Sequence, residues 1–450
     1  MAHGRQYESA RAFRKRVSKP NVSAGDSADS LIRFSAGRVV LVGFVLIGLI
    51  WFGWRIVADT AGYNAATSNP ETALVWTPGE ATALDELAYR EFTKSDGDLN
   101  TARILAERAL RSNPLDARAL TVLGLIAERQ GDQARAGNLM RLSSARTWRD
   151  MTTQAWLLKY DIQSGDFEQA LLHIDALLRT NPRFLEQTIP VLAAFTVDQR
   201  TFDALARLLA SNPPWRAQAL ASLSAQLSDA GRLVQLYAAL KDSQYPAEAT
   251  ELKPYLDRLI KDGRYTEAYQ SWRETLPAQQ RTKEFLLYNG DFASPIDGLP
   301  FNWHLQPFQG VNIQIVASPD KDQGRALRFE FSGTRASFAV GQLMLLPPGE
   351  YSFTGNVRAQ ELRTQRGLEW QISCAEAPNN MLGRTDLVAR TTSWSGFSVA
   401  FTVPQQDCRG QWLKLDIPAR TASERQIEGQ VWYDNLQIRR ATSGNSLEVR

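Results

Sequence analysis

A repeated spacing of 34 residues is the feature that most constrains the fold of this chain. Three glycines stand 34 residues apart, and each is followed at once by an aspartate and, five residues after the glycine, by an alanine. These positions are Gly97, Gly131 and Gly165, then Asp98, Asp132 and Asp166, then Ala102, Ala136 and Ala170. A fixed period of this length is typical of stacked two-helix units. Glycine permits the tight turn between the two helices, and alanine lets them approach closely, so we expect packing roles for these residues.

The three copies resemble the tetratricopeptide repeat (TPR) family, and residues 120–145, LTVLGLIAERQGDQARAGNLMRLSSA, form the best copy. Weaker copies continue downstream, with Ala204, Gly231 and Ala268 in the same phase. The resemblance implies a TPR-like all-α solenoid of about six helical pairs over residues 81–280. A stack of such pairs offers an extended concave surface for protein partners and no natural catalytic cleft.

The charge of the chain is concentrated at its N-terminus. Residues 1–38 contain eight basic and three acidic side chains, whereas the whole chain has a net charge of +3, which leaves the remainder near −2. A nucleic-acid groove requires basic density in the folded part, so we expect no nucleic-acid partner. We interpret residues 1–37 as a disordered basic tail.

An apolar stretch, VVLVGFVLIGLIWFGW at residues 39–54, follows this tail. It predicts a transmembrane helix over residues 38–58, because Arg55 can snorkel and Trp51 and Trp54 suit a membrane interface. A cleaved signal peptide would start nearer the N-terminus and end in small residues, and a buried core helix is the other alternative. Basic residues upstream place the N-terminus in the cytoplasm. We therefore expect a single-pass bacterial inner-membrane protein, with a linker at 59–80 and periplasmic domains beyond it.

The chain contains two cysteines, Cys374 and Cys408, and both fall on the exported side of this topology. In an oxidising compartment a lone pair favours a structural disulfide, with reduced buried thiols as the alternative. Zinc prefers four ligands, and the chain has only three histidines, so we expect no metal site.

From residue 284 the pattern changes to period-two alternation, in runs such as VNIQIV, ALRFEF and WLKLDI. Such runs, separated by turn residues, predict an antiparallel β-sandwich over residues 284–440, followed by a tail at 441–450. The opening YNGDFASPIDGLPFNW and the close VWYDNLQI resemble jelly-roll carbohydrate-binding modules and the galactose-binding-like fold. That resemblance implies core positions for Trp303, Trp394 and Trp432. It also places Asp434 near a structural calcium, although Ala293 stands where the family often has a glutamate ligand, which makes calcium doubtful.

Strand alternation selects candidate ligand residues in the sandwich. In WLKLDI the apolar set is Leu413, Leu415 and Ile417, so Trp412, Lys414 and Asp416 should face outward. The same argument for LEWQISC turns Glu369 and Gln371 outward. An outward tryptophan with polar neighbours could stack on a sugar ring, and the alternative is that Trp412 packs under a loop or under the helical repeats.

The function expected from these patterns is non-catalytic. The sequence has no GxSxG, GxxxxGK[ST] or HExxH motif and no Cys/His cluster. Exported TPR rods resemble scaffolds of polysaccharide synthesis and secretion. The leading hypothesis is therefore a scaffold for envelope or exopolysaccharide assembly that docks proteins on the rod and glycan on the sandwich. The alternatives are a pure protein-assembly factor and a carbohydrate-active enzyme whose site shows no motif. No cofactor is expected.

Overall fold

The computed structural model describes residues 36–319, 324–378 and 380–441. The tails expected at residues 1–37 and 441–450 therefore lie almost wholly outside the described residues. The chain divides into two compact units, residues 1–119 and 120–450. Each unit is described separately below.

The first unit begins with a long apolar helix, α1 (Ala36–Ala65), whose residues 44–65 are long and apolar enough to cross a membrane. Twenty-two residues at about 1.5 Å rise span about 33 Å, close to the roughly 30 Å hydrocarbon core. The stretch predicted as a linker, residues 59–80, is mostly helical. It contains the end of α1 and a second helix, α2 (Pro70–Trp76), which packs against α1 through an aromatic contact between Trp54 and Trp76.

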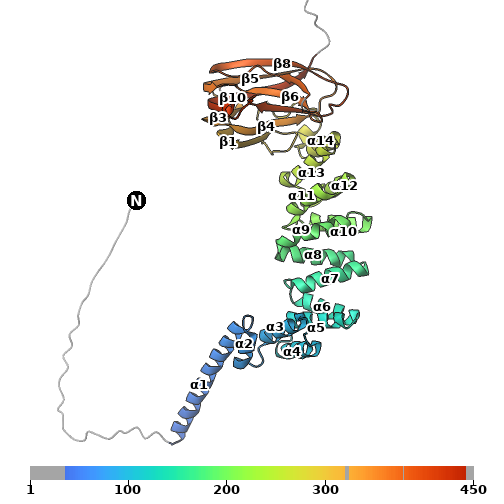
Figure 1. Ribbon diagram of the computed structural model, residues 1–450, viewed down its shortest axis with the longest axis vertical. Helices are drawn as coiled ribbons and strands as arrows, with labels where there is room; N and C mark the ends of the chain where they lie inside the picture. The colour runs from blue at the N-terminus through green and yellow to red at the C-terminus, as the bar shows by residue number, and fades with distance from the viewer. Residues whose placement is uncertain (1–35, 320–323, 379, 442–450) are drawn as a thin grey trace, which may run out of the picture. The chain divides into compact units, whose positions relative to one another are not determined.

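Twelve further helices, α3 to α14, occupy the region in which the repeats were expected, and a short helix, α15, follows them (Figure 1). Helices α3 and α4 belong to the first unit, α5 spans the boundary, and the others belong to the second. Their bounds are α3 (Ala81–Thr93), α4 (Leu99–Ser112), α5 (Ala117–Arg129), α6 (Gln133–Arg146), α7 (Met151–Ser164), α8 (Phe167–Thr180), α9 (Leu185–Ala194), α10 (Gln199–Ala210), α11 (Arg216–Gln226), α12 (Ala230–Lys241), α13 (Ala249–Lys261), α14 (Tyr265–Arg273) and α15 (Ala278–Arg281).

The repeated Gly-Asp pairs lie at the turns between helices. Gly131 has a φ of 83°, a conformation that glycine adopts without steric cost, and a Cβ on Gly97 would come within 1.8 Å of the Glu91 carbonyl oxygen. Each aspartate then caps the next helix: the Asp132 carboxylate accepts from the Arg135 N–H at 3.0 Å. The repeated alanines, Ala102, Ala136 and Ala170, are fully buried. These positions therefore build the turns and helix contacts, while membership of the TPR family stays a prediction.

A hydrophobic core, called here the helical core, runs through helices α8 to α14 and continues into the first residues of the β region. Its β-region members include Leu299, Phe301 and Leu343. The ring of Trp272 on α14 lies 5.6 Å from that of Phe301 and 5.1 Å from that of Tyr288. Aromatic packing thus joins the last helices to the start of the sandwich.

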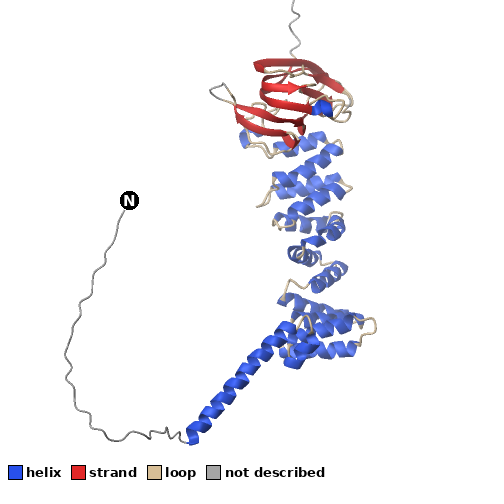
Figure 2. Cartoon of the chain, turned by 60° about the vertical axis from the view of Figure 1, so that its left-hand side comes forward, coloured by secondary structure: helices blue, strands red, loops and turns tan. Residues whose placement is uncertain are grey.

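Ten strands form two antiparallel sheets that face each other, shown in red in Figure 2. Sheet A has the order β1-β4-β9-β6-β7, and its strands are β1 (His304–Gln309), β4 (Ser337–Met344), β9 (Gln411–Asp416), β6 (Glu369–Cys374) and β7 (Met381–Arg384). Sheet B has the order β2-β3-β10-β5-β8, and its strands are β2 (Val311–Ala317), β3 (Arg325–Arg335), β10 (Gln426–Arg440), β5 (Gly349–Thr364) and β8 (Thr392–Val403). The β-sandwich agrees with the predicted fold class.

The sandwich core contains Trp303 as predicted, together with Trp370, Leu413 and Leu415. The predictions for Trp394 and Trp432 were wrong. On β10 the neighbouring Val431 and Tyr433 face the core, so Trp432 leaves the opposite side of sheet B, where the Arg358 guanidinium lies 5.4 Å from its ring centroid.

Trp394 is only half-buried, and its indole N–H donates to the Pro319 carbonyl at 2.9 Å. A large aromatic in a sandwich sequence can thus cover an outer face as well as fill the core. Period-two alternation around the residue, rather than the residue type, decides between the two.

Candidate functional site

The outer face of sheet A carries the residues that alternation selected. On β9, Leu413 and Leu415 point into the sandwich core, so Trp412, Lys414 and Asp416 leave the other side of the strand. On β6, Trp370 and Ile372 are core residues, and Glu369 and Gln371 leave the same outer side. β6 and β9 are paired neighbours, which brings all five side chains onto one face.

Cross-strand register orders this face into rows. Lys414 pairs with Gln371 on one side and with Gly341 on the other, and Gln371 pairs with Arg384 on β7. Gly341 in turn pairs with His304 on β1. A row of polar side chains therefore crosses the sheet, interrupted at Gly341, where a Cβ would come within 2.5 Å of the Leu413 carbonyl oxygen. His304 and Arg384 were not among the sequence candidates, because only strand pairing shows that they join this row.

The second row pairs Asp416 with Glu369. Glu369 leaves the predicted face but is only 4% exposed, so the expectation that it is open to solvent was wrong. Its Oε1 accepts from the Gln371 side-chain amide at 2.8 Å, and Asp416 lies 3.4 Å from the Arg425 guanidinium. Alternation determines the face that a side chain leaves, whereas its neighbours on that face decide its exposure.

Trp412 also leaves the predicted face without being open to solvent. It is half-buried and packs against the helical core, beside Leu343, its partner on β4. The Lys414 ammonium lies 5.0 Å from the Trp412 ring centroid. The alternative raised from the sequence, packing against the helices, therefore describes Trp412 better than an open stacking platform.

Phe308 is an aromatic that the sequence analysis missed. It lies at an irregularity of the β1–β4 pairing, near the end of β1, and is 61% exposed. No local pattern marks it, because β1 reads HLQPFQ and lacks a clear alternation. It supplies an accessible aromatic surface on an edge strand of sheet A.

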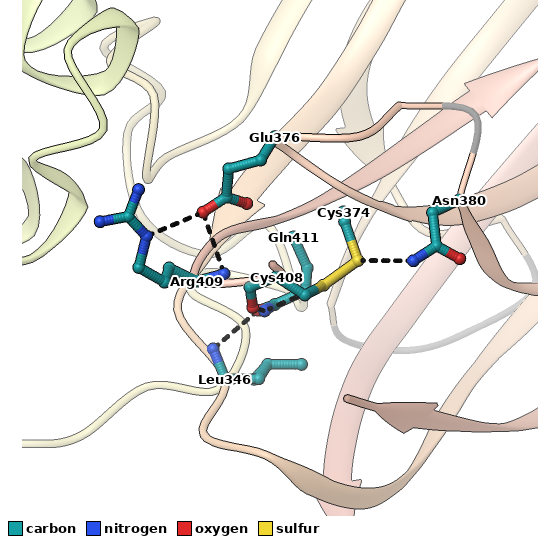
Figure 3. Close-up of a disulfide and its surroundings, with 7 residues drawn as sticks. All are labelled: Leu346, Cys374, Glu376, Asn380, Cys408, Arg409 and Gln411. Atoms are coloured by element: carbon teal, nitrogen blue, oxygen red, sulfur yellow. Dashed lines mark hydrogen bonds and ion pairs between the residues drawn. A yellow bond between two sulfur atoms is a disulfide. The ribbon is translucent and has the colours of Figure 1, made fainter. Parts of the chain in front are cut away.

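The two cysteines form a disulfide that braces sheet A against the last helices (Figure 3). Gln411 beside the bridge donates to the Cys408 carbonyl at 2.6 Å and accepts from the Leu346 N–H at 2.8 Å. The next residue, Arg409, forms an ion pair with Glu376 at 3.1 Å, and its guanidinium lies 5.7 Å from the Tyr265 ring at the start of α14. The disulfide thus holds an arginine against the helical part.

Metal ligation was tested at the position where the family resemblance suggested calcium. Asp434 is 7% exposed, and Ala293 occupies the position of the missing glutamate. Within the described ranges, no group of three or more His, Cys, Asp or Glu side chains could hold a metal ion.

No family model matches this chain, and no curated protein matches it. Among solved structures, the chain is similar to a family 4 carbohydrate-binding module at 14% identity and a TM-score of 0.27, over 34% of this chain and 99% of that one. It is similar to a CBM61 module in complex with β-1,4-galactotriose at 16% identity and a TM-score of 0.25, over 35% and 100%. It is also similar to a CBM22-1 xylan-binding domain from Paenibacillus barcinonensis at 11% identity and a TM-score of 0.22, over 32% and 87%.

Proposed function

We propose that this chain is a non-catalytic scaffold that binds a glycan on the outer face of sheet A, anchored in the bacterial inner membrane by α1. The observation that carries this proposal is the polar row formed by Lys414, Gln371 and Arg384, with Asp416 and Glu369 beside it. A sugar offers several hydroxyl groups on a ring, and adjacent cross-strand side chains present donors and acceptors at a matching spacing. Such a face recognises hydroxyl groups without any need for a catalytic residue.

Aromatic contact is the second requirement for sugar binding, because the apolar face of a pyranose stacks on an aromatic ring. Trp412 is committed to the helical core, so it cannot supply this contact. Phe308 is the exposed aromatic of sheet A, and we assign the stacking role to it.

The membrane anchor and its direction rest on α1 and on the sequence before it. The described part of α1 exposes Phe44, Ile50, Trp51 and Trp54, each more than half accessible, as a helix surrounded by lipid would. Basic residues upstream favour an N-terminus in the cytoplasm, which would place the helices and the sandwich in the periplasm.

Protein partners are assigned to the helical part. A cavity of about 710 Å³ lies among α12, α13 and α14, with Leu252 and Leu299 in its lining and Asp242 and Glu274 among its polar groups. Cavities of this size accept side chains of a partner. Envelope or exopolysaccharide-export proteins are the partners we propose.

One observation favours the second candidate function, a pure protein-assembly factor whose sandwich binds no sugar. The sandwich has used Trp412 and Leu343 of sheet A to dock on its own helices. A sheet that already serves a protein contact could serve a second one.

Binding of the full-length protein, purified in detergent, to an array of bacterial and plant polysaccharides tests the glycan assignment. Gln371→Ala should lower retention, because it removes hydrogen bonds from the centre of the polar row. Gln430→Ala is the matched control, since Gln430 lies on sheet B between its partners Glu330 and Gln360 and should leave retention unchanged. Absence of retention of every polysaccharide by the wild-type protein would reject the glycan function and favour the assembly factor.

A further inference from the structure

A second cavity, of about 570 Å³, opens at the end of the sandwich away from Trp412. It lies between the end of β1, the start of β4 and the segment 419–425 that precedes β10, three parts of the chain that are distant in sequence. Its lining includes the exposed Phe308, the hydroxyl groups of Ser337 and Thr421, and the arginines Arg335, Arg420 and Arg425. This volume falls in the range of roughly 300 to 1,000 Å³ typical of small-ligand sites.

The charge of this cavity is uniformly positive. The described residues that line it include three arginines and no aspartate or glutamate. Arg425 is the one arginine of the three with a carboxylate partner, Asp416 at 3.4 Å, and within the described ranges neither Arg335 nor Arg420 forms an ion pair.

The nearest carboxylate to Arg420 in sequence is Glu424, and it is already engaged. It pairs with Arg366 at 2.7 Å and accepts from the Arg420 backbone N–H at 2.7 Å. The hydrogen bond from Arg366 holds the pKa of Glu424 at about 2, so this carboxylate stays ionised and paired at neutral pH. The guanidinium groups of Arg335 and Arg420 remain available to an anion.

Asp416 and Arg425 connect this cavity to the polar row of sheet A. Asp416 lies on the outer face beside Glu369, and Arg425 lines the cavity. A polymer lying along the face can therefore place one of its residues in the cavity while others contact Lys414 and Gln371.

We propose that this cavity binds an acidic sugar, a pyranose bearing a carboxylate, and that it makes the sandwich selective for acidic polysaccharides. This inference rests on the proposed glycan function and names its ligand class. A guanidinium presents a planar fork of N–H groups that matches a carboxylate in a bidentate geometry. Phe308 offers its ring to the apolar face of the same sugar, and Ser337 and Thr421 offer hydrogen bonds to its hydroxyl groups.

The test compares two polymers that share a backbone and differ in charge: polygalacturonate, and the same polymer with its carboxylates methyl-esterified. Dextran sulfate, an acidic polymer without carboxylates, is the third probe. The full-length wild-type protein in detergent should bind polygalacturonate at least tenfold more tightly than the ester and more tightly than dextran sulfate. Raising the salt concentration should weaken this binding, because it screens the arginines.

Arg335→Gln and Arg420→Gln should each weaken binding of polygalacturonate about tenfold, since each removes a charge-assisted hydrogen bond, and should leave binding of the ester unchanged. Arg439→Gln is the control, because it removes an exposed positive charge from β10 at a distance from the cavity. Equal effects of all three substitutions would show non-specific attraction and overturn the proposal.

Further outcomes separate this inference from the glycan function on which it rests. Binding of the ester and of polygalacturonate with equal affinity, unchanged by Arg335→Gln and Arg420→Gln, would overturn acidic selectivity and leave glycan binding intact. A preference for dextran sulfate over polygalacturonate would overturn the carboxylate assignment. No binding of any of the three polymers, together with an empty glycan array, would remove the glycan function itself.

Discussion

Trp412 on β9 lies opposite Leu343 on β4, and both side chains pack against the core of the helical part and not against the core of their own sandwich. Two adjacent strands of sheet A thus contribute an apolar patch to a helix contact at one end of the face. The polar row of Lys414, Gln371 and Arg384 lies beside this patch on the same sheet. One sheet face therefore serves an internal docking contact and a candidate binding surface.

Trp412→Ala should destabilise the contact between the helices and the sandwich while leaving glycan binding in place. Because the side chain is half-buried, we expect a loss of about 1 to 3 kcal/mol, below the cost of truncating a fully buried tryptophan. Faster amide hydrogen exchange in α14 would report the loosened contact. A variant that lost glycan retention with unchanged exchange in α14 would restore Trp412 as a ligand contact.

Phe308→Ala should show the opposite pattern. An exposed ring contributes little to folding, so its removal should change the free energy of unfolding by about 0.5 kcal/mol or less. Polysaccharide retention should fall, because the stacking surface is lost. Thermal unfolding and affinity electrophoresis of the same preparation measure both quantities, and unchanged retention would contradict the stacking role.

Replacing both cysteines, Cys374→Ser with Cys408→Ser, should cost about 3 to 4 kcal/mol of sandwich stability by the loop-entropy estimate for a bridge that spans 34 residues. Calorimetry of the wild-type and doubly substituted proteins measures this loss. The bridge should resist reduction in the folded protein, since the two cysteines are 0% and 5% exposed. Rapid reduction by dithiothreitol under native conditions would contradict that expectation.

Ala136→Phe should destabilise the helical part by about 1 to 3 kcal/mol or more, because Ala136 is fully buried in a cluster with Ala127, Met140 and Trp156. The same substitution at Ala134, an exposed position on the same helix, provides the control and should be nearly neutral. Thermal unfolding of the two variants should differ clearly. Equal melting temperatures would show that the 34-residue phase was misassigned.

Stability of the first unit should depend on the buried carboxyl of Asp85. Burial and the neighbouring Asp116 raise the pKa of Asp85 from 3.8 to about 8, although Arg118 lowers it in part. The folded state then binds the proton more tightly than the unfolded state. The stabilisation is therefore complete below about pH 4 and is lost as the pH rises toward about 8.

Asp85→Asn should abolish this decline, because the amide does not titrate, whereas Asp96→Asn at an exposed position should preserve it. Thermal unfolding of the three proteins between pH 4 and 8 measures the effect. A decline of equal slope in Asp85→Asn would assign the pH dependence to other groups.

Fusions of a reporter that is active only outside the cytoplasm test the direction of α1. Fusion after Gly62 should give activity, and fusion before Ser30 should give none, because the basic residues precede the apolar segment. Activity of the second fusion alone would reverse the orientation.

The sequence by itself determined the features that depend on short-range physics. Gly131 and Asp132 mark a turn and a helix cap because both act within a few residues, and the alternation of Leu413 and Leu415 assigns the two faces of β9 because side chains leave a strand on alternate sides. The apolar run at residues 39–54 predicted a long apolar helix for the same reason.

Only the tertiary structure decided what covers each face and which distant residues meet. Trp412 and Glu369 leave the predicted side of their strands but are covered by neighbours that the local pattern does not contain. Trp432 stands among arginines of adjacent strands and not in the core. Phe308, Arg335 and Arg420 come together in one cavity because strand order brings remote segments to the same end of the sandwich. Exposure and proximity are properties of the packed chain, since they depend on contacts between residues that are far apart in sequence.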